Sequence, residues 1–329
     1  MLLQGTVKKH QALWLENESL KIGVLPHKGA DIYEFIYKPA GVDFLMKTPS
    51  GLQPPGERPP VDFLENYEGG WQELFPNPGD AYASQGVSLP FHGEVALLPW
   101  ETTVERDDDE ETAIRLTVFC RQTPFKLERR MRLRQGLPAL EIMGSVTNLS
   151  DEPASFCWGH HVVLGGNFLE GGCSLDVPAR LIITPAELYE PETARLAPGQ
   201  MEPWPMARSR EPGGEFDLRR IPGPVAHSHD DVYLSGLEKG AVSVSNPRLG
   251  LRFWLDWDAQ IFGCLVNWQP FGGADLPPLT GIYGVGIEPW VSRLGLEGAI
   301  QAGEALTLKP GASLSTRLFA GVAATCPAC

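Results

Sequence analysis

Four short segments of the sequence carry side chains that could move protons. They contain His92 in FHGEV, the pair His160 and His161 in CWGHHVVL, Asp231 in HDDVYL and Glu288 in GVGIEPW. Each lies in or beside an extended apolar stretch, where a solvated polar side chain is not expected. Imidazoles and carboxylates brought together would form a site for general acid–base catalysis near neutral pH. The sequence therefore predicts a proton-transferring enzyme if the fold joins these segments.

The segment around Glu288 gives the sharpest local signal. Side chains alternate between the two faces of a strand, so Glu288 and Trp290 share one face. Gly284 and Gly286 lie on that face too, and glycines in a strand often mark a place where a ligand approaches the backbone. Apolar neighbours would desolvate the Glu288 carboxylate and raise its pKa. We interpret Glu288 as a candidate base; an ordinary glutamate on an edge strand ended by Pro289 is the alternative.

The two adjacent histidines must point to opposite faces of their strand, so at most one of them faces a given pocket. His161 shares its face with Gly159, and the space left by that glycine favours His161 as the residue facing the pocket. His160 stays a candidate for substrate binding. A buried structural histidine is the alternative for each.

The loop GGWQELFPNPGD (69–80) combines an aromatic ring with amide and acid side chains. Trp71 could lie against the face of a sugar, while Gln72, Glu73 or Asn77 could bind its hydroxyl groups. An ordinary turn-rich connection explains the same residues equally well.

Metal and cofactor signals are weak. His92 and Glu94 have the His-x-Glu spacing of a cupin metal strand, and His227 and His229 form a second pair. The further ligand motifs of a cupin are not at the required places, and no glycine-rich nucleotide fingerprint is present. We expect neither a metal nor an organic cofactor.

The composition restricts the classes of partner. The chain has 329 residues and a net charge of −14, which disfavours a nucleic-acid partner. The one dense basic stretch, residues 126–134, alternates like a strand, with Arg129 on the same face as its leucines. We interpret it as a solvated sheet face rather than a phosphate site. Without a signal peptide or a membrane span, we expect a cytoplasmic protein with mostly reduced cysteines.

Short β-rich runs separated by turn signals predict an all-β fold of antiparallel sheets with little helix, in one domain over residues 1–329. Two proline-rich stretches, 49–60 and 187–224, are expected to be loops, because they hold few periodic apolar residues. The tail 323–329, which ends in Cys-Pro-Ala-Cys, is expected to be frayed. The clearest strand candidates are residues 20–26, 31–38, 113–120, 251–257, 260–268 and 313–322.

In this order along the chain, the segments resemble the aldose 1-epimerase (galactose mutarotase-like) family over roughly residues 18–320, as a divergent branch. The resemblance lies in KGADIYEFIYKPAGVDFL, in HGE followed by Pro99-Trp100, in NLSDEPASFCWGHHVVL, in DVY and in IEPW. It implies a large antiparallel β-sandwich with its site on one concave face. It also implies opening and closing of the ring of a free aldose.

The resemblance also implies roles for individual residues. Glu288 would be the base and His161 the acid in ring opening, with the roles reversing on closure. His92 would hydrogen-bond the developing charge at the ring oxygen or orient the sugar, and Asp231 would bind distal hydroxyl groups. Trp290 would flank the sugar. The arginine that galactose mutarotases carry in the sugar-contacting loop is missing here, while Arg293 could reach a phosphate.

The partner implied is a small carbohydrate, and the expected assembly is a monomer or homodimer. Two other classes stay open: a non-catalytic carbohydrate-binding or sensing protein on the same fold, and a glycoside hydrolase or lyase. Hydrolysis usually needs two carboxylates flanking the bond, and only Glu288 has a strongly site-like context in the sequence.

Overall fold

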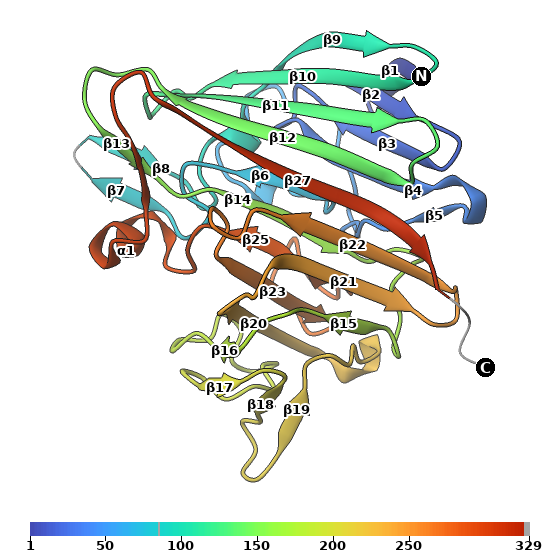
Figure 1. Ribbon diagram of the computed structural model, residues 1–329. Coiled ribbons are helices and arrows are strands. Elements are labelled where there is room, and N and C mark those ends of the chain that lie inside the picture. Colours follow the sequence, from blue (N-terminus) through green and yellow to red (C-terminus); the bar gives the residue numbers. More distant parts are fainter. Residues whose placement is uncertain (85, 326–329) are drawn as a thin grey trace.

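Two large antiparallel sheets make up most of the protein (Figure 1). The computed structural model describes residues 1–84 and 86–325. The larger sheet has 13 strands. In spatial order they are β1 (Leu2–Val7), β2 (His10–Glu16), β3 (Leu20–Leu25), β4 (Asp31–Tyr37), β6 (Trp71–Leu74), β14 (Gly159–Leu164), β25 (Glu288–Trp290), β23 (Cys264–Phe271), β20 (Ser228–Ser235), β16 (Leu181–Ile183) and β17 (Met201–Pro203), with β5 (Val42–Asp43) beside β4 and β24 (Val285–Gly286) beside β14.

The second sheet has eight strands. Their order is β15 (Ser174–Asp176), β21 (Gly240–Asn246), β22 (Leu251–Trp257), β27 (Ser313–Ala324), β12 (Ala139–Asn148), β11 (Phe125–Arg134), β10 (Glu111–Phe119) and β9 (Glu101–Asp107). Small hairpin-like pairs lie at the periphery: β7 (Tyr82–Ser84) with β8 (Val87–Leu89), β13 (Ala154–Phe156) with β26 (Leu306–Leu308), and β18 (Met206–Arg208) with β19 (Glu215–Asp217).

Helical structure is scarce, as the sequence predicts. In residues 1–84 and 86–325 the one α-helix is α1 (Gly295–Ala302), which lies beside β7 and β8 (Figure 1). The 3₁₀ turns are η1 (Lys38–Ala40), η2 (Leu64–Asn66), η3 (Val95–Leu97) and η4 (Pro224–Ala226). No helix in the described part of the chain is long and apolar enough to cross a membrane.

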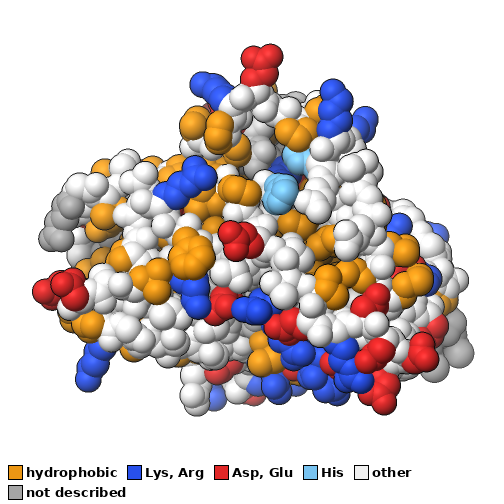
Figure 2. Space-filling view, turned by 90° about the horizontal axis from the view of Figure 1, so that it is seen from above, with side chains coloured by type: hydrophobic (Ala, Val, Ile, Leu, Met, Phe, Trp, Pro, Cys, Tyr) orange, Lys and Arg blue, Asp and Glu red, His pale blue; other side chains and the backbone are white. Residues whose placement is uncertain are grey.

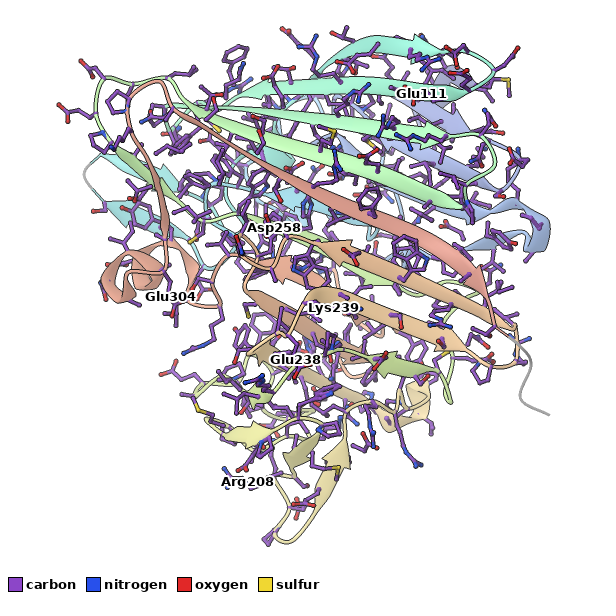
Figure 3. The ribbon with its side chains drawn as sticks, in the orientation of Figure 1. Glu111, Arg208, Glu238, Lys239, Asp258 and Glu304 are labelled. Atoms are coloured by element: carbon purple, nitrogen blue, oxygen red, sulfur yellow. The ribbon has the colours of Figure 1, made fainter. Side chains whose placement is uncertain are left out.

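The all-β prediction is confirmed, and five of the six strand candidates match a strand to within two residues at each end; the candidate 260–268 begins four residues before β23 and ends three residues before it does. Two details differ. The stretch 187–224 is not irregular throughout, because it contains the short strands β17, β18 and β19. Arg208 belongs to β18, and it lies in the β18–β19 pair at the bottom of the view in Figure 3.

The predicted frayed tail is wrong at its start. Ala323 and Ala324 continue β27 and pair with Arg252 and Leu251 of β22, because the ladder supplies partners for their backbone groups. Cys326–Cys329 lie outside the described residues.

The core lies between the two sheets. Phe35 of β4 and Phe44 approach Phe253 of β22 with ring centroids 5.2 and 5.4 Å apart, which joins one sheet to the other. In β11, Leu127 and Met131 are buried, while the alternate side chains face outward. The alternation of hydrophobic and charged residues thus decides which face of each strand packs inward.

The outward face of β9, β10 and β11 carries cross-strand ion pairs. Arg115 bonds Glu105 at 3.0 Å and Glu128 at 3.2 Å, and Arg130 also reaches Glu105. Positive and negative side chains are likewise intermixed on the face seen in Figure 2. The interpretation of the basic stretch as a solvated sheet face is therefore confirmed for its outward residues.

Arg129 is the exception in this stretch, because it points into the core. Its Nη1 donates to Glu73 Oε2 of β6 at 3.2 Å, and both side chains are only 1% exposed. The indole of Trp158 donates to the other Glu73 oxygen at 2.9 Å, and Arg129 also donates to the carbonyl of Ala30. Burial raises the pKa of Glu73 and lowers that of Arg129, so each depends on the other for charge compensation. The pair fixes β6 against the second sheet.

Replacing Arg129 alone should therefore destabilise the protein strongly. We expect Arg129→Met to lower the free energy of unfolding by about 3–5 kcal/mol, because Glu73 loses its buried counterion. Urea denaturation measures this loss. The double variant Glu73→Gln/Arg129→Met, which keeps an acceptor for Trp158, should recover part of it, and Arg130→Met on the outward face should cost about 1 kcal/mol or less. Equal effects of Arg129→Met and Arg130→Met would contradict this account.

Candidate active site

Cross-strand register brings the candidate residues to one face of the larger sheet. Glu288 of β25 lies opposite Val266 of β23, and Asp231 of β20 lies opposite Trp268. Residues directly opposite in antiparallel strands present their side chains on the same face. Their chain neighbours, such as Ile287, belong to the core between the sheets. The polar face is therefore the one turned away from the second sheet.

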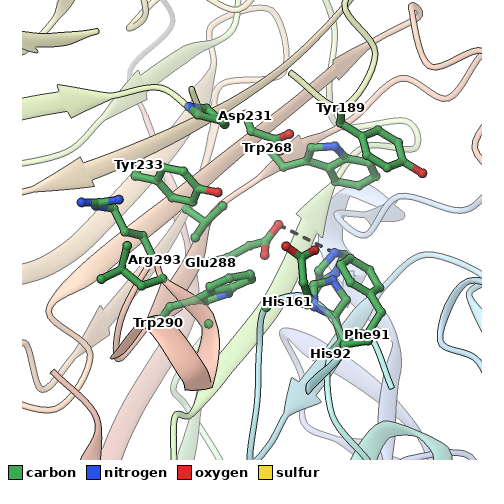
Figure 4. Close-up of a pocket in the computed structure, with 18 of the residues that line it drawn as sticks. Phe91, His92, His161, Tyr189, Asp231, Tyr233, Trp268, Glu288, Trp290 and Arg293 are labelled. Carbon is green, nitrogen blue, oxygen red and sulfur yellow. Dashed lines mark ion pairs between the residues drawn. The ribbon is translucent and has the colours of Figure 1, made fainter. Parts of the chain in front are cut away.

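This face forms the floor of a pocket with a volume of about 940 Å³. His161, Asp231, Glu288, Trp290 and Arg293 all contribute to its lining, as does His92 from the segment before η3. Figure 4 shows Glu288 and His161 facing each other near the centre, with Asp231 on one side and His92 on another. The walls come from loops, chiefly the residues around 63–67, 80–82 and 185–189.

Glu288 and His161 form an acid–base pair at the centre of the pocket. His161 Nε2 lies 3.8 Å from Glu288 Oε1, and their side chains are 7% and 2% exposed. Neither Glu288 Oε1 nor His161 Nδ1 has a hydrogen-bond partner among the described residues. Buried polar atoms without partners are uncommon and mark places where a ligand or water completes the bonding.

Burial decides where the proton of this pair resides. Loss of solvent raises the pKa of Glu288 well above its ordinary value, and the nearby charge of Asp231 raises it further. The same loss of solvent lowers the pKa of His161 to about 3. Both shifts favour the uncharged state of the pair, in which Glu288 carries a proton and His161 does not.

His92 is oriented by the backbone. Its Nδ1 contacts the carbonyl oxygen of Pro78, and because a carbonyl only accepts, Nδ1 carries the hydrogen. Burial, with a contribution from His161, lowers the pKa of His92 well below its usual range. The ring is therefore neutral, and its Nε2 is an acceptor. The ring of Phe91 packs against the His92 ring with centroids 3.7 Å apart, and the centroid of the His161 ring lies 5.4 Å from that of His92.

Two glycines make room for the site. A side chain at Gly159 would come within 2.8 Å of the Trp290 ring, so the space predicted beside His161 is occupied by this indole. A side chain at Gly286 would collide with a carboxylate oxygen of Glu288 and approach Trp268 Cβ within 2.8 Å.

Arg293 enters the pocket from the segment between β25 and α1. This segment is fixed at Ser292, whose hydroxyl donates to Glu304 at 2.6 Å just beyond the helix (Figures 3 and 4). Burial raises the pKa of Tyr233, and the nearby positive charge of Arg293 offsets a small part of this increase. Arg293 and Tyr233 thus form a second polar region of the pocket, beside Trp290 (Figure 4).

Five of the predicted binding residues do not line this pocket, which corrects the prediction: Trp71, Gln72, Glu73, Asn77 and His160. Trp71 is fully buried in the core, with its indole Nε1 3.4 Å from Nδ1 of His160. His160 itself packs against Phe262 on the core side. Gln72 donates to the carbonyl of Gly69 at 2.7 Å. The segment from Trp71 is a central strand covered on both faces, not an exposed loop.

Asn77 is also buried, and its side chain hydrogen-bonds to the backbone of α1. Its side-chain oxygen accepts the N–H of Leu296 at 2.9 Å in the first turn of α1. A side-chain acceptor at this place satisfies a donor that the helix itself leaves free. Asn77 therefore holds α1 beside the pocket rather than touching its contents.

The sequence reasoning missed several aromatic residues of the lining. Trp268 lies in one of the strand candidates, but nothing in its local sequence distinguishes it from a core residue. Tyr67 and Tyr189 come from irregular segments without periodicity, so no pattern pointed to them. His229, earlier considered as part of a metal pair with His227, is buried, whereas His227 is exposed. Among the residues that the structure describes, no cluster of three or more His, Cys, Asp or Glu could hold a metal ion.

Gly286→Ala tests the close packing under Glu288. We expect the free energy of unfolding to fall by about 1–3 kcal/mol, because the added methyl group overpacks the site. Thermal or urea denaturation measures the loss. Gly263→Ala is the matched control, since the nearest atom to its new methyl group is 3.7 Å away. If both variants were equally stable, the crowding around Glu288 would be refuted.

Comparisons with solved structures define the fold. A protein from Synechocystis, Slr1438, is 20% identical with a TM-score of 0.70, over 97% of this chain and 99% of that one. A candidate aldose 1-epimerase from Klebsiella pneumoniae has 16% identity and a TM-score of 0.73, over 97% and 81%. A galactose mutarotase-like protein from Clostridium acetobutylicum has 14% identity and a TM-score of 0.66, over 99% of both chains.

The chain thus has the galactose mutarotase-like fold, which confirms the resemblance at the level of the fold. A family model described as a domain of unknown function (DUF4432) matches residues 8–322, and the chain belongs to this family. No curated protein matches the sequence.

Proposed function

We propose that this protein is an aldose 1-epimerase, which interconverts the α and β anomers of a free sugar. The observation that carries the proposal is the Glu288–His161 pair, buried 3.8 Å apart on the floor of an open pocket. Opening a hemiacetal ring needs one group to take a proton from the C1 hydroxyl and another to give a proton to the ring oxygen. A pair in which one member carries a proton and the other does not supplies both groups.

The position of the proton suggests which group acts first. Because Glu288 holds the proton in the empty pocket, His161 Nε2 accepts the C1 hydroxyl proton while Glu288 protonates the ring oxygen. The C1–ring oxygen bond breaks and an open-chain aldehyde forms. After rotation about C1–C2, the reverse transfers close the ring on the other face. For ring opening the family resemblance implies the opposite roles, with Glu288 as the base at the C1 hydroxyl and His161 as the acid at the ring oxygen; the directions of the two pKa shifts favour the assignment proposed here.

The other lining residues would bind the sugar. Neutral His92 offers Nε2 as an acceptor for a hydroxyl group, which replaces the expectation that it donates to the ring oxygen. Asp231 is suited to accept hydrogen bonds from distal hydroxyl groups, and the Trp290 ring provides an apolar wall. Arg293 is available for a hydroxyl group or an anionic substituent. A cytoplasmic location and a monomer or homodimer stay predictions from the sequence.

Activity measurements test the proposal. Freshly dissolved α-aldoses, neutral and phosphorylated, should equilibrate faster with the protein, as followed by polarimetry. Glu288→Gln and His161→Gln should each lower kcat/KM by about 10²–10⁴-fold, because each removes one of the two proton-transfer groups. His27→Gln, at an exposed histidine outside the pocket, should leave the rate unchanged. If the wild-type protein accelerates the anomer equilibration of none of these aldoses, the enzyme proposal is refuted. Saturable sugar binding without acceleration would then favour the non-catalytic binder.

The pH dependence tests the proton assignment. Below a pH of about 3, His161 is protonated and the pair has no base; as pH rises through the raised pKa of Glu288, the pair loses its acid. After subtraction of the uncatalysed rate, kcat/KM should therefore be flat through mildly acidic pH and fall on the alkaline side. An increase of kcat/KM with pH that follows the ionisation of an ordinary carboxylic acid would contradict the assignment.

A further inference from the structure

Three side chains form a continuous hydrogen-bond chain behind one wall of the pocket. Trp268 Nε1 lies 2.6 Å from His229 Nε2, and His229 Nδ1 lies 2.5 Å from Glu190 Oε2. They come from β23, from β20 and from the segment that precedes β17. The proposed proton transfers use none of these bonds.

The partners determine the state of His229. An indole N–H can only donate, so His229 Nε2 accepts and carries no hydrogen. The carboxylate of Glu190 accepts, so Nδ1–H donates to it. His229 is therefore a neutral ring with both nitrogens engaged. It has no free nitrogen for a substrate or a metal, and it acts as a connector.

One end of the chain reaches the catalytic pair. The ring of Trp268 lies 5.8 Å from the ring of His161, and it stands opposite Asp231 in the strand register. Trp268 lines the pocket (Figure 4) and is 9% exposed, so most of the indole is buried while part of it meets the cavity. Its position thus affects the shape of the space beside His161.

The other end of the chain reaches the pocket mouth. Glu190 accepts the backbone N–H of Asp275 at 3.1 Å and that of Leu276 at 2.9 Å. It directly follows Tyr189, which also lines the pocket and packs on His229 at 5.9 Å. One carboxylate therefore ties two loops of the mouth to His229 and, through it, to Trp268.

We propose that Glu190 and His229 are positioning residues that fix the indole of Trp268 as the surface on which the apolar face of the sugar lies. A sugar presents C–H groups on one face, and a ring held in one orientation binds them with a smaller loss of entropy than a mobile ring. Without His229, the buried indole N–H would lose its acceptor, and the ring would turn to find another. The hydrogen-bond chain would also keep Tyr189 at the pocket mouth. This inference rests on the proposed function for its ligand, a carbohydrate.

The test combines His229→Leu with a conservative rescue. His229→Leu removes both hydrogen bonds, whereas His229→Gln offers one acceptor and one donor. We expect His229→Leu to raise KM about tenfold, equal to about 1.4 kcal/mol, with kcat changed less than threefold, and His229→Gln to restore most of the affinity. His227→Leu, at the exposed histidine two residues earlier, is the control and should leave KM unchanged.

A second readout does not depend on turnover. In ¹⁵N-labelled protein, the Trp268 indole N–H resonance, assigned through its absence in Trp268→Phe, should be protected from solvent exchange. The protection should be lost in His229→Leu and regained in His229→Gln. Titration with the same aldoses gives Kd where no anomer conversion occurs, so failure of the enzyme proposal is distinguished from failure of the relay. Unchanged exchange, or unchanged KM and Kd, in His229→Leu would overturn the inference, as would wild-type protein that binds no sugar in the panel.

Discussion

The pocket depends on one constraint, the alternation of side chains in the central strands β14, β25, β23 and β20. Each strand must turn its apolar residues toward the second sheet, and Val162, Ile287 and Leu265 do so. The residues between them are thereby forced to the opposite face. A slip of one residue in any of these strands would bury a charge in the core and open the core to the pocket. Packing between the sheets thus fixes the relative positions of the polar side chains.

The glutamates Glu73 and Glu288 are both buried in the interior, and their charges are dealt with in different ways. Glu73 and Arg129 are buried together, with Trp158 as a further donor, so their charges compensate and the pair serves the structure. Glu288 is buried without a cation, and its neighbour His161 is neutral. An uncompensated carboxyl group keeps its proton instead. The first arrangement stabilises the fold, whereas the second places a mobile proton beside an open cavity.

Much of the fold and part of the site could be predicted from the sequence. Period-two patterning identified the strands, and parity separated His161, which lines the pocket, from His160, which lies in the core. The segment from Trp71 was predicted to be a loop, because local sequence does not reveal that β6 is a central strand covered on both faces. The residues of the pocket mouth could not be predicted either, because Tyr189 and Glu190 lie in an irregular stretch. Their partners His229 and Asp275 are far away in the chain.

The central claim is that Glu288 carries a proton while the neighbouring His161 is neutral. Infrared difference spectroscopy of wild-type protein against Glu288→Gln at neutral pH tests it most directly, because subtraction removes the contributions of other buried acids such as Asp31. The account predicts a protonated carboxylic acid band in the wild type that is missing in the variant. A carboxylate band in its place, with a protonated His161 in the ¹⁵N spectrum of the imidazoles, would contradict it.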